Sequence, residues 1–392
     1  MQYLEMSAGT QWSCKTLILT CLTNYLFAAE NNAMTEQNSQ AVLPCWMIYG
    51  ANGYTGEMIA REAVRRGYRP VLAGRRRESV EALARDLGLE TRIFSLENTV
   101  EAISQLKGCA LVLNCAGPFS VTALPLMETC LRTRTHYLDI TGEIDVFETA
   151  QSMNPRAQNA GIVLCPGVGF DVIPTDCVAA ALKDAMPDAI QLNLGFDSRS
   201  VFSPGTAKTA IEGLAQGGKI RQGGKIITVP IAYDVRRIDF GDGEKDAMTI
   251  PWGDVSTAYY TTGIPDIQVF VPGSTRMISR ARRANHIRPL LQLAWVQKLL
   301  KTFISRTVKG PGEEKRQQTP SFVWGEVINA SGEKKTARIR TPNGYTLTIL
   351  GSLTVVEFLM VNQVAGGAYT PATLMGASLI TQLPGTGPLR IV

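Results

Sequence analysis

Three glycines spaced three residues apart could hold a phosphate group. Gly50, Gly53 and Gly56 follow the short apolar run of residues 45–49, and a helical pattern begins near Tyr54. In such a turn between a strand and a helix, backbone N–H groups and the helix dipole face an anion. The spacing differs by one residue from the dinucleotide fingerprint G-x-G-x-x-G. We therefore predict a nucleotide-binding turn, whose contacts are Gly50, Asn52, Gly53, Tyr54, Thr55 and Gly56.

Arginine ends the second predicted strand, at the position that distinguishes the two nicotinamide dinucleotides. Residues 70–74 are apolar enough for a buried strand, and Arg75, Arg76 and Arg77 follow them. An acidic residue here binds the ribose 2′-hydroxyl of NAD, whereas arginine accommodates the 2′-phosphate of NADP. No acidic residue precedes Glu78, so we predict NADP(H) as the cofactor and Arg75 as its contact. Arginines that are merely exposed at a strand end are the alternative interpretation.

A fourth predicted strand, residues 110–114, ends in a polar turn. Ligands bind at the carboxyl edge of sheets of this kind. Asn114, together with Ala116, Gly117 and Pro118, is therefore predicted to meet the nicotinamide ribose. The alternative is a Gly-Pro turn with a capping asparagine.

A reductase also needs a proton donor, because its cofactor supplies the hydride. Asp139, Glu143 and Asp171 lie at predicted strand ends beside glycines. A carboxylate at such a place can equally cap a helix, which we expect of Asp176. No Tyr-x-x-x-Lys pair of the short-chain reductase type stands at a matching place. The candidate catalytic residues are Asp139, Cys165, Asp171 and Lys208.

Alternating strands and helices position these residues. The first half is expected to hold helices at 54–66, 79–87, 98–106 and 124–132, of which the third is capped by Asn98. Further strands are expected at 91–96 and 162–165. Such alternation predicts the α/β class, with a Rossmann-type, doubly wound parallel sheet. From Ala189 the pattern changes to strands at 191–196, 225–230, 267–271, 322–328 and 336–340, with helices at 206–215 and 353–364. This half is expected to form an α+β domain with a mixed or antiparallel sheet.

These elements divide the chain of 392 residues into four predicted parts. Residues 1–42 are expected to be a disordered N-terminal extension, although residues 17–29 loosely resemble a signal-peptide core and Met34 is an alternative start. Residues 43–173 are expected to form the nucleotide-binding domain, and residues 174–366 a substrate or dimerisation domain through which a homodimer could assemble. Residues 367–392 are expected to return to the nucleotide-binding domain.

Composition argues against several classes of protein. The formal charge of +5 is small for this length, so no nucleic-acid partner is expected. The two histidines lie far apart and without ligand spacing, which argues against a zinc site or a Ser-His-Asp triad. We expect no bound metal. Eight cysteines without any C-x-x-C pair indicate a reducing compartment, and we expect the protein to be cytoplasmic.

One segment of the second half has a different character. In residues 287–308, apolar positions are interleaved with Lys298, Lys301 and Arg306. A basic amphipathic helix of this kind suggests peripheral contact with a membrane surface or a partner. A helix packed on its own domain gives the same pattern and is the more common outcome. No stretch reaches the ~18 apolar residues that spanning a bilayer requires.

Several motifs in order resemble one known family. They are residues 50–56, 73–75, 114–118, 137–139 with 142–143, and 169–171 with 174–176, followed by 204–209, 324–327, 341–346 and 370–372. Together they resemble the saccharopine dehydrogenase-like oxidoreductases, including trans-acting enoyl reductases of lipid biosynthesis. The resemblance covers roughly residues 45–386. It implies an NADP-binding domain followed by an α+β domain whose sheet lies over the nicotinamide.

Three functions remain open at this stage. The first is an NADP-dependent reductase that acts on an acyl or lipid-like enoyl substrate. The second is an amino-acid imine reductase of the saccharopine type, which would need arginines such as Arg199, Arg236 and Arg276 to converge on substrate carboxylates. The third is a non-catalytic NADP-binding partner protein.

Overall fold

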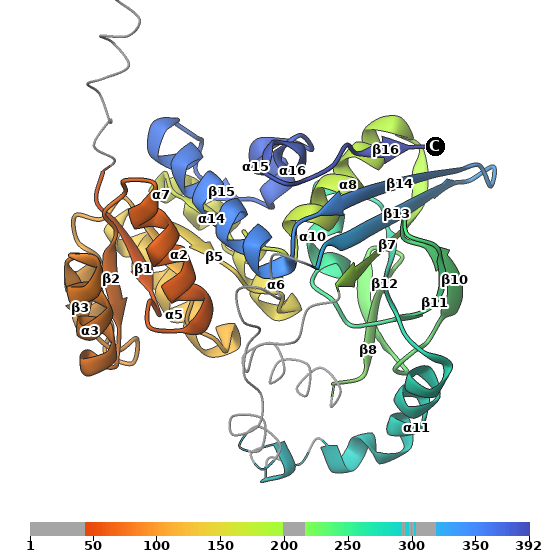
Figure 1. Ribbon diagram of the computed structural model, residues 1–392, viewed down its shortest axis with the longest axis horizontal. Coiled ribbons are helices and arrows are strands. Elements are labelled where there is room, and N and C mark those ends of the chain that lie inside the picture. The colour runs from red at the N-terminus through yellow and green to blue at the C-terminus, as the bar shows by residue number, and fades with distance from the viewer. Residues whose placement is uncertain are drawn as a thin grey trace, which may run out of the picture. The chain divides into compact units, whose positions relative to one another are not determined.

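The computed structural model describes residues 44–198, 216–291 and 319–392, with Leu293, residues 295–297, Leu299 and Thr302 in between (Figure 1). The compact unit Pro44–Val392 holds all of these residues. Some predictions fall outside the described residues. They concern the extension 1–42, Arg199, the motif 204–209 with Lys208, the helix 206–215, and most of the segment beyond Leu291.

A parallel sheet of seven strands forms the nucleotide-binding half, as predicted. Its spatial order is β15-β6-β5-β4-β1-β2-β3, and every printed pairing is parallel. The strands are β1 (Trp46–Tyr49), β2 (Val71–Gly74), β3 (Thr91–Ile93), β4 (Leu111–Asn114), β5 (His136–Asp139), β6 (Val163–Cys165) and β15 (Gly367–Ala368). β1 and β4 are neighbours, so the chain changes direction across the sheet between them, which opens a binding crevice at their carboxyl ends.

Six helices cover the two faces of this sheet. They are α2 (Tyr54–Arg65), α3 (Arg77–Leu87), α4 (Thr99–Leu106), α5 (Phe119–Thr133), α6 (Ile144–Ser152) and α7 (Asn154–Ala160). Local sequence sets several of their ends. The Asn98 side chain accepts a hydrogen bond from the Glu101 N–H at 3.2 Å and so caps α4, as predicted. Gly88, in the left-handed region at φ 64°, ends α3.

A mixed sheet forms the second half, also as predicted. Its main path is β10-β11-β12-β7-β13-β14-β16, in which only the printed pair β12–β7 is parallel, and the hairpin β8–β9 branches from β12. The strands are β7 (Ala189–Ser198), β8 (Gly218–Gln222), β9 (Lys225–Val229), β10 (Val235–Asp239), β11 (Glu244–Thr249), β12 (Asp266–Pro272), β13 (Ser321–Asn329), β14 (Lys334–Thr341) and β16 (Arg390–Ile391).

Helix α8 (Ile173–Ala185) packs against β13 of this sheet. The approach is close at Gly325, where a Cβ atom would lie 2.6 Å from Val178 Cγ1. One hydrophobic cluster continues from the parallel sheet through α8 into the mixed sheet, and includes Leu113, Ile173 and Val323. The two sheets therefore share a core.

Two helices of the second half differ from the predictions. α14 (Gly344–Val361) begins nine residues before the predicted 353, because Asn343 caps it by accepting from the Tyr345 N–H at 3.0 Å. α11 (Thr275–Leu291) begins twelve residues before the predicted 287. Its early turns are rich in arginine, so they lack the apolar pattern on which the prediction relied.

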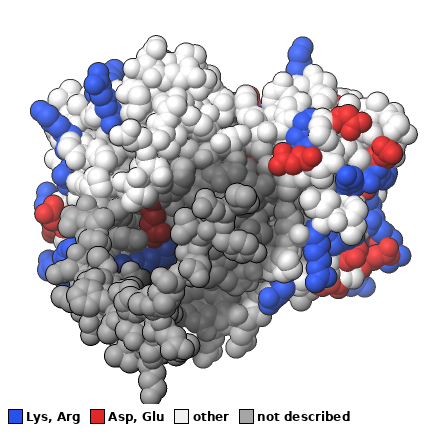
Figure 2. All heavy atoms as spheres, turned by 90° about the horizontal axis from the view of Figure 1, so that it is seen from above, with Lys and Arg blue, Asp and Glu red and all other residues white. Residues whose placement is uncertain are grey.

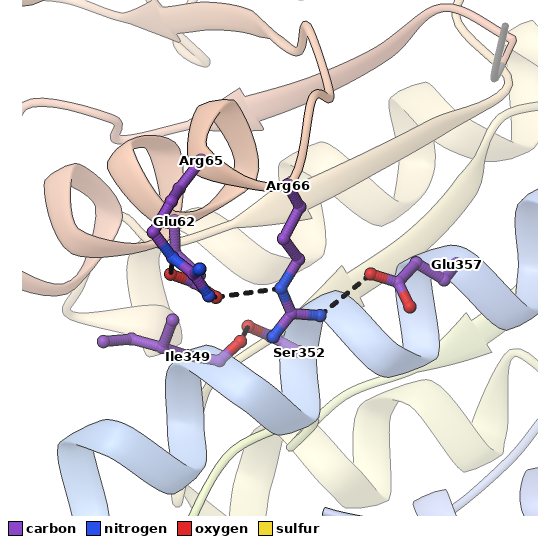
Figure 3. Close-up of polar contacts among 6 residues, drawn as sticks. All are labelled: Glu62, Arg65, Arg66, Ile349, Ser352 and Glu357. Atoms are coloured by element: carbon purple, nitrogen blue, oxygen red, sulfur yellow. Dashed lines mark hydrogen bonds and ion pairs between the residues drawn. The ribbon is translucent and has the colours of Figure 1, made fainter. Parts of the chain in front are cut away.

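Helix α14 is long and apolar enough to cross a membrane by length and composition, contrary to the prediction that no stretch would be. Within the compact unit, 44% of it is buried, and it packs along α2. At their C-terminal ends, Arg66 bridges Glu62 and Glu357 with two ion pairs of 2.9 Å (Figure 3). At their N-terminal ends, the rings of Tyr54 and Tyr345 meet edge to face, 5.3 Å apart.

Candidate active site

The glycine turn after β1 is sterically obligatory. Gly50 has φ 81°, and a Cβ atom on it would lie 2.7 Å from the Ala116 nitrogen. A Cβ atom on Gly56 would lie 2.5 Å from the Gly50 carbonyl oxygen. Gly53 is the N-cap of α2 and offers no capping side chain, so the first turn of α2 is open to an anion. These features fit a dinucleotide pyrophosphate.

Other predicted contacts surround this turn. Asn52 Nδ2 donates to Ser79 Oγ at 2.9 Å, which ties the turn to α3. Tyr54 and Thr55 lie half-buried in the first turn of α2. They are therefore positioned at the open end of the helix, as the predicted contacts require.

Arg77 differs from the two arginines that precede it, because Arg75 and Arg76 are exposed without a paired carboxylate in the described chain. Arg76 is the N-cap of α3, and Arg77 pairs with Glu81 at 2.8 Å. Arg75 is exposed at the end of β2, and no carboxylate pairs with it in the part of the chain that the structure describes. Its charge reaches β1, where it opposes the rise that burial causes in the pKa of Tyr49. Arg75 is therefore an available cation at this edge, and its contact with a 2′-phosphate stays a prediction.

Asn114 supports the loop of residues 116–118, with which it was predicted to contact the nicotinamide ribose. It is fully buried, its Nδ2 donates to Thr122 Oγ1 and to the Tyr137 hydroxyl at 3.2 Å each, and its Oδ1 accepts from the Ala116 N–H at 3.0 Å. This side chain positions the loop from below. Ala116 is half-buried, and Gly117 and Pro118 are exposed, joined by a cis peptide. A direct contact between Asn114 and the cofactor stays a prediction.

Asp139 is a fully buried anchor at the end of β5. Its carboxylate accepts from the Tyr137 hydroxyl at 2.7 Å, the Thr141 N–H at 3.0 Å and the Gly167 N–H at 2.9 Å. Burial raises the pKa of Asp139 to about 6, against these hydrogen bonds. The side chain thus holds the loops after β5 and β6 together, and it is enclosed on all sides.

The candidate Cys165 and the strand-end carboxylate Glu143 both lie in structural surroundings. Cys165 is fully buried in the core cluster at the end of β6, where burial raises the pKa of its thiol well above the usual range. The thiolate that reactivity would need is disfavoured there. The Glu143 carboxylate accepts from the Phe119 and Ser120 N–H groups at 2.9 and 2.7 Å, so it caps α5.

Asp171 has the properties of a proton donor. It follows β6, is half-buried, and its Oδ2 occupies the space that the missing side chain of Gly142 leaves, 2.9 Å from where a Cβ atom would stand. Burial raises the pKa of this carboxyl to about 7. Among the described residues, no charged neighbour contributes to that shift. A carboxyl group whose pKa lies near 7, with access to solvent, can both hold and release a proton at physiological pH.

Aromatic residues from the second half contact the backbone of Asp171 and the ring of Phe170, and the sequence did not point to them. Trp252 Nε1 donates to the Asp171 carbonyl at 2.9 Å. The ring of Phe196 lies 5.6 Å from that of Phe170 and 4.8 Å from that of Trp252. No local pattern could have shown these contacts, because strand β7 and the loop before α10 (Asp254–Thr262) are distant in sequence from β6.

The first turn of α14 is another part of the site, and its contacts were not predicted from the sequence. The Phe170 N–H donates to Thr348 Oγ1 at 3.0 Å, and a Cβ atom on Gly344 would lie 3.1 Å from the Phe170 ring. Since Tyr345 of the same turn meets Tyr54, this turn lies between the phosphate end and the Asp171 end. The predicted motif 341–346 coincides with it.

Asp176 and Asp254 are two fully buried carboxyl groups near Asp171. Asp176 was expected to cap its own helix, but it accepts from the Thr261 hydroxyl and from the Ala372 N–H at 2.8 Å, so it caps α15 (Pro371–Met375). Asp254 is fully buried, and burial raises its pKa well above the usual range. The Thr175 hydroxyl lies close enough to oppose that shift, yet neither Asp254 oxygen has a hydrogen bond of normal geometry in the described chain. Burial therefore favours the protonated form of Asp254.

Comparison with known proteins identifies the nucleotide-binding half. Residues 46–165 match the family described as the saccharopine dehydrogenase NADP binding domain. The chain carries a saccharopine dehydrogenase NADP-binding domain. This match confirms the predicted family resemblance and NADP(H) as the cofactor. It also extends from the glycine turn to the end of β6, so it spans the whole cofactor edge of the sheet except β15.

Two curated relatives cover part of the chain. A saccharopine dehydrogenase-like oxidoreductase of Arabidopsis thaliana is 28% identical over 200 residues, which are 45% of this chain and 44% of the relative. A protein of Mycobacterium tuberculosis, provisionally named a trans-acting enoyl reductase, is 28% identical over 185 residues, 43% of this chain and 44% of that protein. The chain thus spans less than half the length of the curated relatives it matches.

One solved structure shares the fold over most of the chain. Apo saccharopine dehydrogenase (L-Glu forming) from Saccharomyces cerevisiae matches with a TM-score of 0.58 at 11% identity, covering 89% of this chain and 100% of that one. At this identity the likeness concerns the fold alone. The arrangement of a parallel nucleotide-binding sheet and a mixed second sheet is therefore common to both proteins.

Proposed function

We propose that the protein is an NADPH-dependent reductase of an acyl or lipid-like enoyl substrate, with Asp171 as the proton donor. The observation that carries the proposal is the Asp171 carboxyl, half-buried at the carboxyl edge of an NADP-binding sheet with a pKa of about 7. Bound NADPH would supply the hydride. The chain itself must then orient the substrate and give a proton to the carbon beside the one reduced.

Each part of the site has a task in this proposal. The glycine turn and the open end of α2 bind the pyrophosphate, and Arg75 binds the 2′-phosphate. Asn114 and Asp139 hold the loops at the strand ends in place. Asp171 delivers its proton and recovers one from solvent, to which it keeps access.

The surroundings of Asp171 favour an apolar substrate over an amino acid. Phe170, Phe196 and Trp252 pack together as an aromatic cluster, and Trp252 also donates to the Asp171 carbonyl. An amino-acid substrate would need cations beside it. Arg236, however, pairs with Asp234 at 2.6 Å and lies over the Phe270 ring at 4.9 Å. Arg276 is exposed on α11. Neither described arginine affects the pKa of Asp171.

Substrate assays separate the three candidate functions. NADPH oxidation would be followed with a panel of enoyl thioesters of increasing chain length, and separately with 2-oxoglutarate plus lysine. Turnover of the thioesters alone supports the proposal. Turnover of only the amino-acid pair would assign the saccharopine-type reaction instead. Tight NADPH binding without turnover of either would indicate a non-catalytic NADP-binding protein.

We also propose peripheral membrane contact through residues 287–308, together with the earlier turns of α11, which begins at Thr275. α11 contains five arginines and no acidic residue. Arg276, Arg280, Arg283, Ile287 and Leu290 share one helical face at three- and four-residue spacing and are all exposed. A cationic face that becomes apolar suits an anionic membrane surface. Sedimentation with anionic vesicles, but not with neutral ones, tests the contact, and Arg280→Glu with Arg283→Glu should abolish it.

A cytoplasmic homodimer is the remaining part of the proposal. Between Asn343 and Leu389 the only charged residue is Glu357. This stretch includes all of α14, α15 and α16 (Leu379–Gln382). In Figure 2, a view from above Figure 1, part of the described surface carries few charged side chains. A face of this kind could receive a second copy of the chain. Light scattering after gel filtration measures the mass directly, and a monomer at micromolar concentration would refute the dimer.

A further inference from the structure

Two cysteines meet at the amino edge of the nucleotide-binding sheet, the edge opposite the cofactor. Cys45 directly precedes β1, and Cys109 lies two residues before β4. Their Sγ atoms are 3.3 Å apart. The sheet itself enforces this approach, because Trp46 pairs with Leu111 and the Ala110 N–H donates to the Cys45 carbonyl at 2.8 Å.

The two thiols differ in access and surroundings. Cys45 is exposed, whereas Cys109 is buried. Burial raises the pKa of Cys109, and the guanidinium of Arg92, which donates to its Sγ at 3.3 Å, opposes that rise. The same Arg92 nitrogen also donates to the Gln105 carbonyl, so α4 fixes the cation beside the sulfur. An oxidant from solvent therefore reaches Cys45 first, and Cys109 is the sulfur that can react with the product.

We propose that Cys45 and Cys109 are a redox modification site that peroxide closes to a disulfide. Cys45 Sγ attacks one oxygen of hydrogen peroxide, the O–O bond breaks, and the leaving hydroxide takes the thiol proton as water. Cys109 Sγ then attacks the sulfur of the Cys45 sulfenic acid. The S–O bond breaks, and this hydroxide takes the Cys109 proton as a second water. Both sulfurs are oxidised and the peroxide is reduced.

The cross-link requires little movement and leaves the cofactor edge alone. A disulfide bond is about 2.05 Å long, so the sulfurs must approach by about 1.2 Å. Cys45 and Gly50 lie at opposite ends of β1, whose residues rise ~3.3 Å each. The disulfide would join β1 and β4 within a domain where they already pair. We therefore expect higher stability with little change in NADPH affinity.

Peptide mapping of the full-length protein tests the site. Reduced protein is treated with a small excess of hydrogen peroxide, alkylated and digested without reductant. The expected product is a Cys45–Cys109 cross-linked peptide, reversed by dithiothreitol, with an unfolding midpoint several degrees higher and an NADPH Kd within about twofold of the reduced form. A sulfinic acid on Cys45 without a cross-link, or a bond from Cys45 to another cysteine, would overturn the proposal.

Variants sharpen the result. Cys109→Ser should leave a Cys45 sulfenic acid that dimedone traps, and Cys45→Ser should give neither the cross-link nor the dimedone adduct at this site. Cys115→Ser, at the other end of β4, is the matched control and should keep the cross-link. If the Cys109→Ser variant does not fold, the peptide map of the unmodified protein still shows whether the Cys45–Cys109 cross-link forms. A cross-link that persists in Cys45→Ser would show that other thiols account for the oxidation.

Discussion

The phosphate end and the Asp171 end of the site are held by different kinds of interaction. At the phosphate end, glycines allow backbone to approach backbone, and the predicted binding groups are N–H groups at the start of α2. At the Asp171 end, side chains from β7, the loop before α10 and α14 contact one another and the backbone of residues 170 and 171. The first end depends on what is absent from the chain, namely Cβ atoms. The second depends on side chains that must all be present.

This difference predicts that the phosphate end is the less tolerant of added volume. Gly50→Val should lower NADPH affinity at least ~100-fold and destabilise the protein by roughly 2–4 kcal/mol, because φ 81° and the Ala116 contact both oppose a side chain. Isothermal titration and urea unfolding measure the two effects. Gly387→Ala, where a Cβ atom would have only ordinary contacts, is the control. Normal NADPH binding by the Gly50→Val variant would remove this turn from the cofactor site.

At the other end, chemistry should be lost while binding remains. Asp171→Asn should lower kcat by ~10²–10⁴-fold, since the proton donor is removed, with NADPH affinity unchanged. In the unmodified protein, turnover should fall as pH rises through about 7, where the carboxyl loses its proton. Asp145→Asn, exposed on α6, is the matched control. Full activity in the Asp171→Asn variant would rule out the proposed donor.

The buried carboxyls should also give the protein an unusual pH dependence of stability. Burial raises the native pKa of Asp171 to about 7 and that of Asp139 and Asp176 to about 6. The native state then binds more protons than the unfolded state, so stability should decrease from about pH 4 to pH 7, by up to ~1.4 kcal/mol per pH unit for each group. Urea unfolding across this range measures the slope, and Asp171→Asn should reduce it. A stability that rises over the range would contradict the raised pKa values.

Cofactor choice should depend on one side chain of the phosphate end. Arg75→Ala should narrow the preference for NADPH over NADH by roughly tenfold, about 1.4 kcal/mol, because the 2′-phosphate loses its cation. Fluorescence titration with both cofactors measures the ratio. Arg77→Ala, whose guanidinium pairs with Glu81, should leave the ratio unchanged. Equal affinities for both cofactors in the unmodified protein would refute this role of Arg75.

The smallest effect on stability is expected from the ion pair between α2 and α14. Glu357→Gln should cost ~0.5–1 kcal/mol of stability, because the Arg66–Glu357 pair in Figure 3 is only partly buried. A double-mutant cycle with Arg66→Met isolates the pair from the Arg66–Glu62 contact. A coupling energy near zero would mean that the apolar contacts of α14 alone hold the helices together.

The sequence allowed the prediction of features that neighbouring residues determine. The parallel sheet, the glycine turn, the Asn98 cap and the position of Arg75 all follow from short-range patterns, and the structure agrees with them. The contacts of residues 170 and 171 do not follow, because Trp252 and Thr348 bond to their backbone from distant segments. The same holds for Asp176, which caps α15 rather than its own helix, and for Cys45 and Cys109, whose contact depends on strand order.

Strand β15 gives the nucleotide-binding sheet a late step in folding. Its residues 367 and 368 pair with Val163 and Leu164 of β6, so about 200 residues separate the two partners. During synthesis on the ribosome, the edge of β6 that pairs with β15 stays unpaired until the second half of the chain has emerged. Exposed strand edges invite pairing with other chains. A nascent chain stalled before residue 367 should therefore bind chaperones more than one that includes Ala372, whose N–H also reaches Asp176.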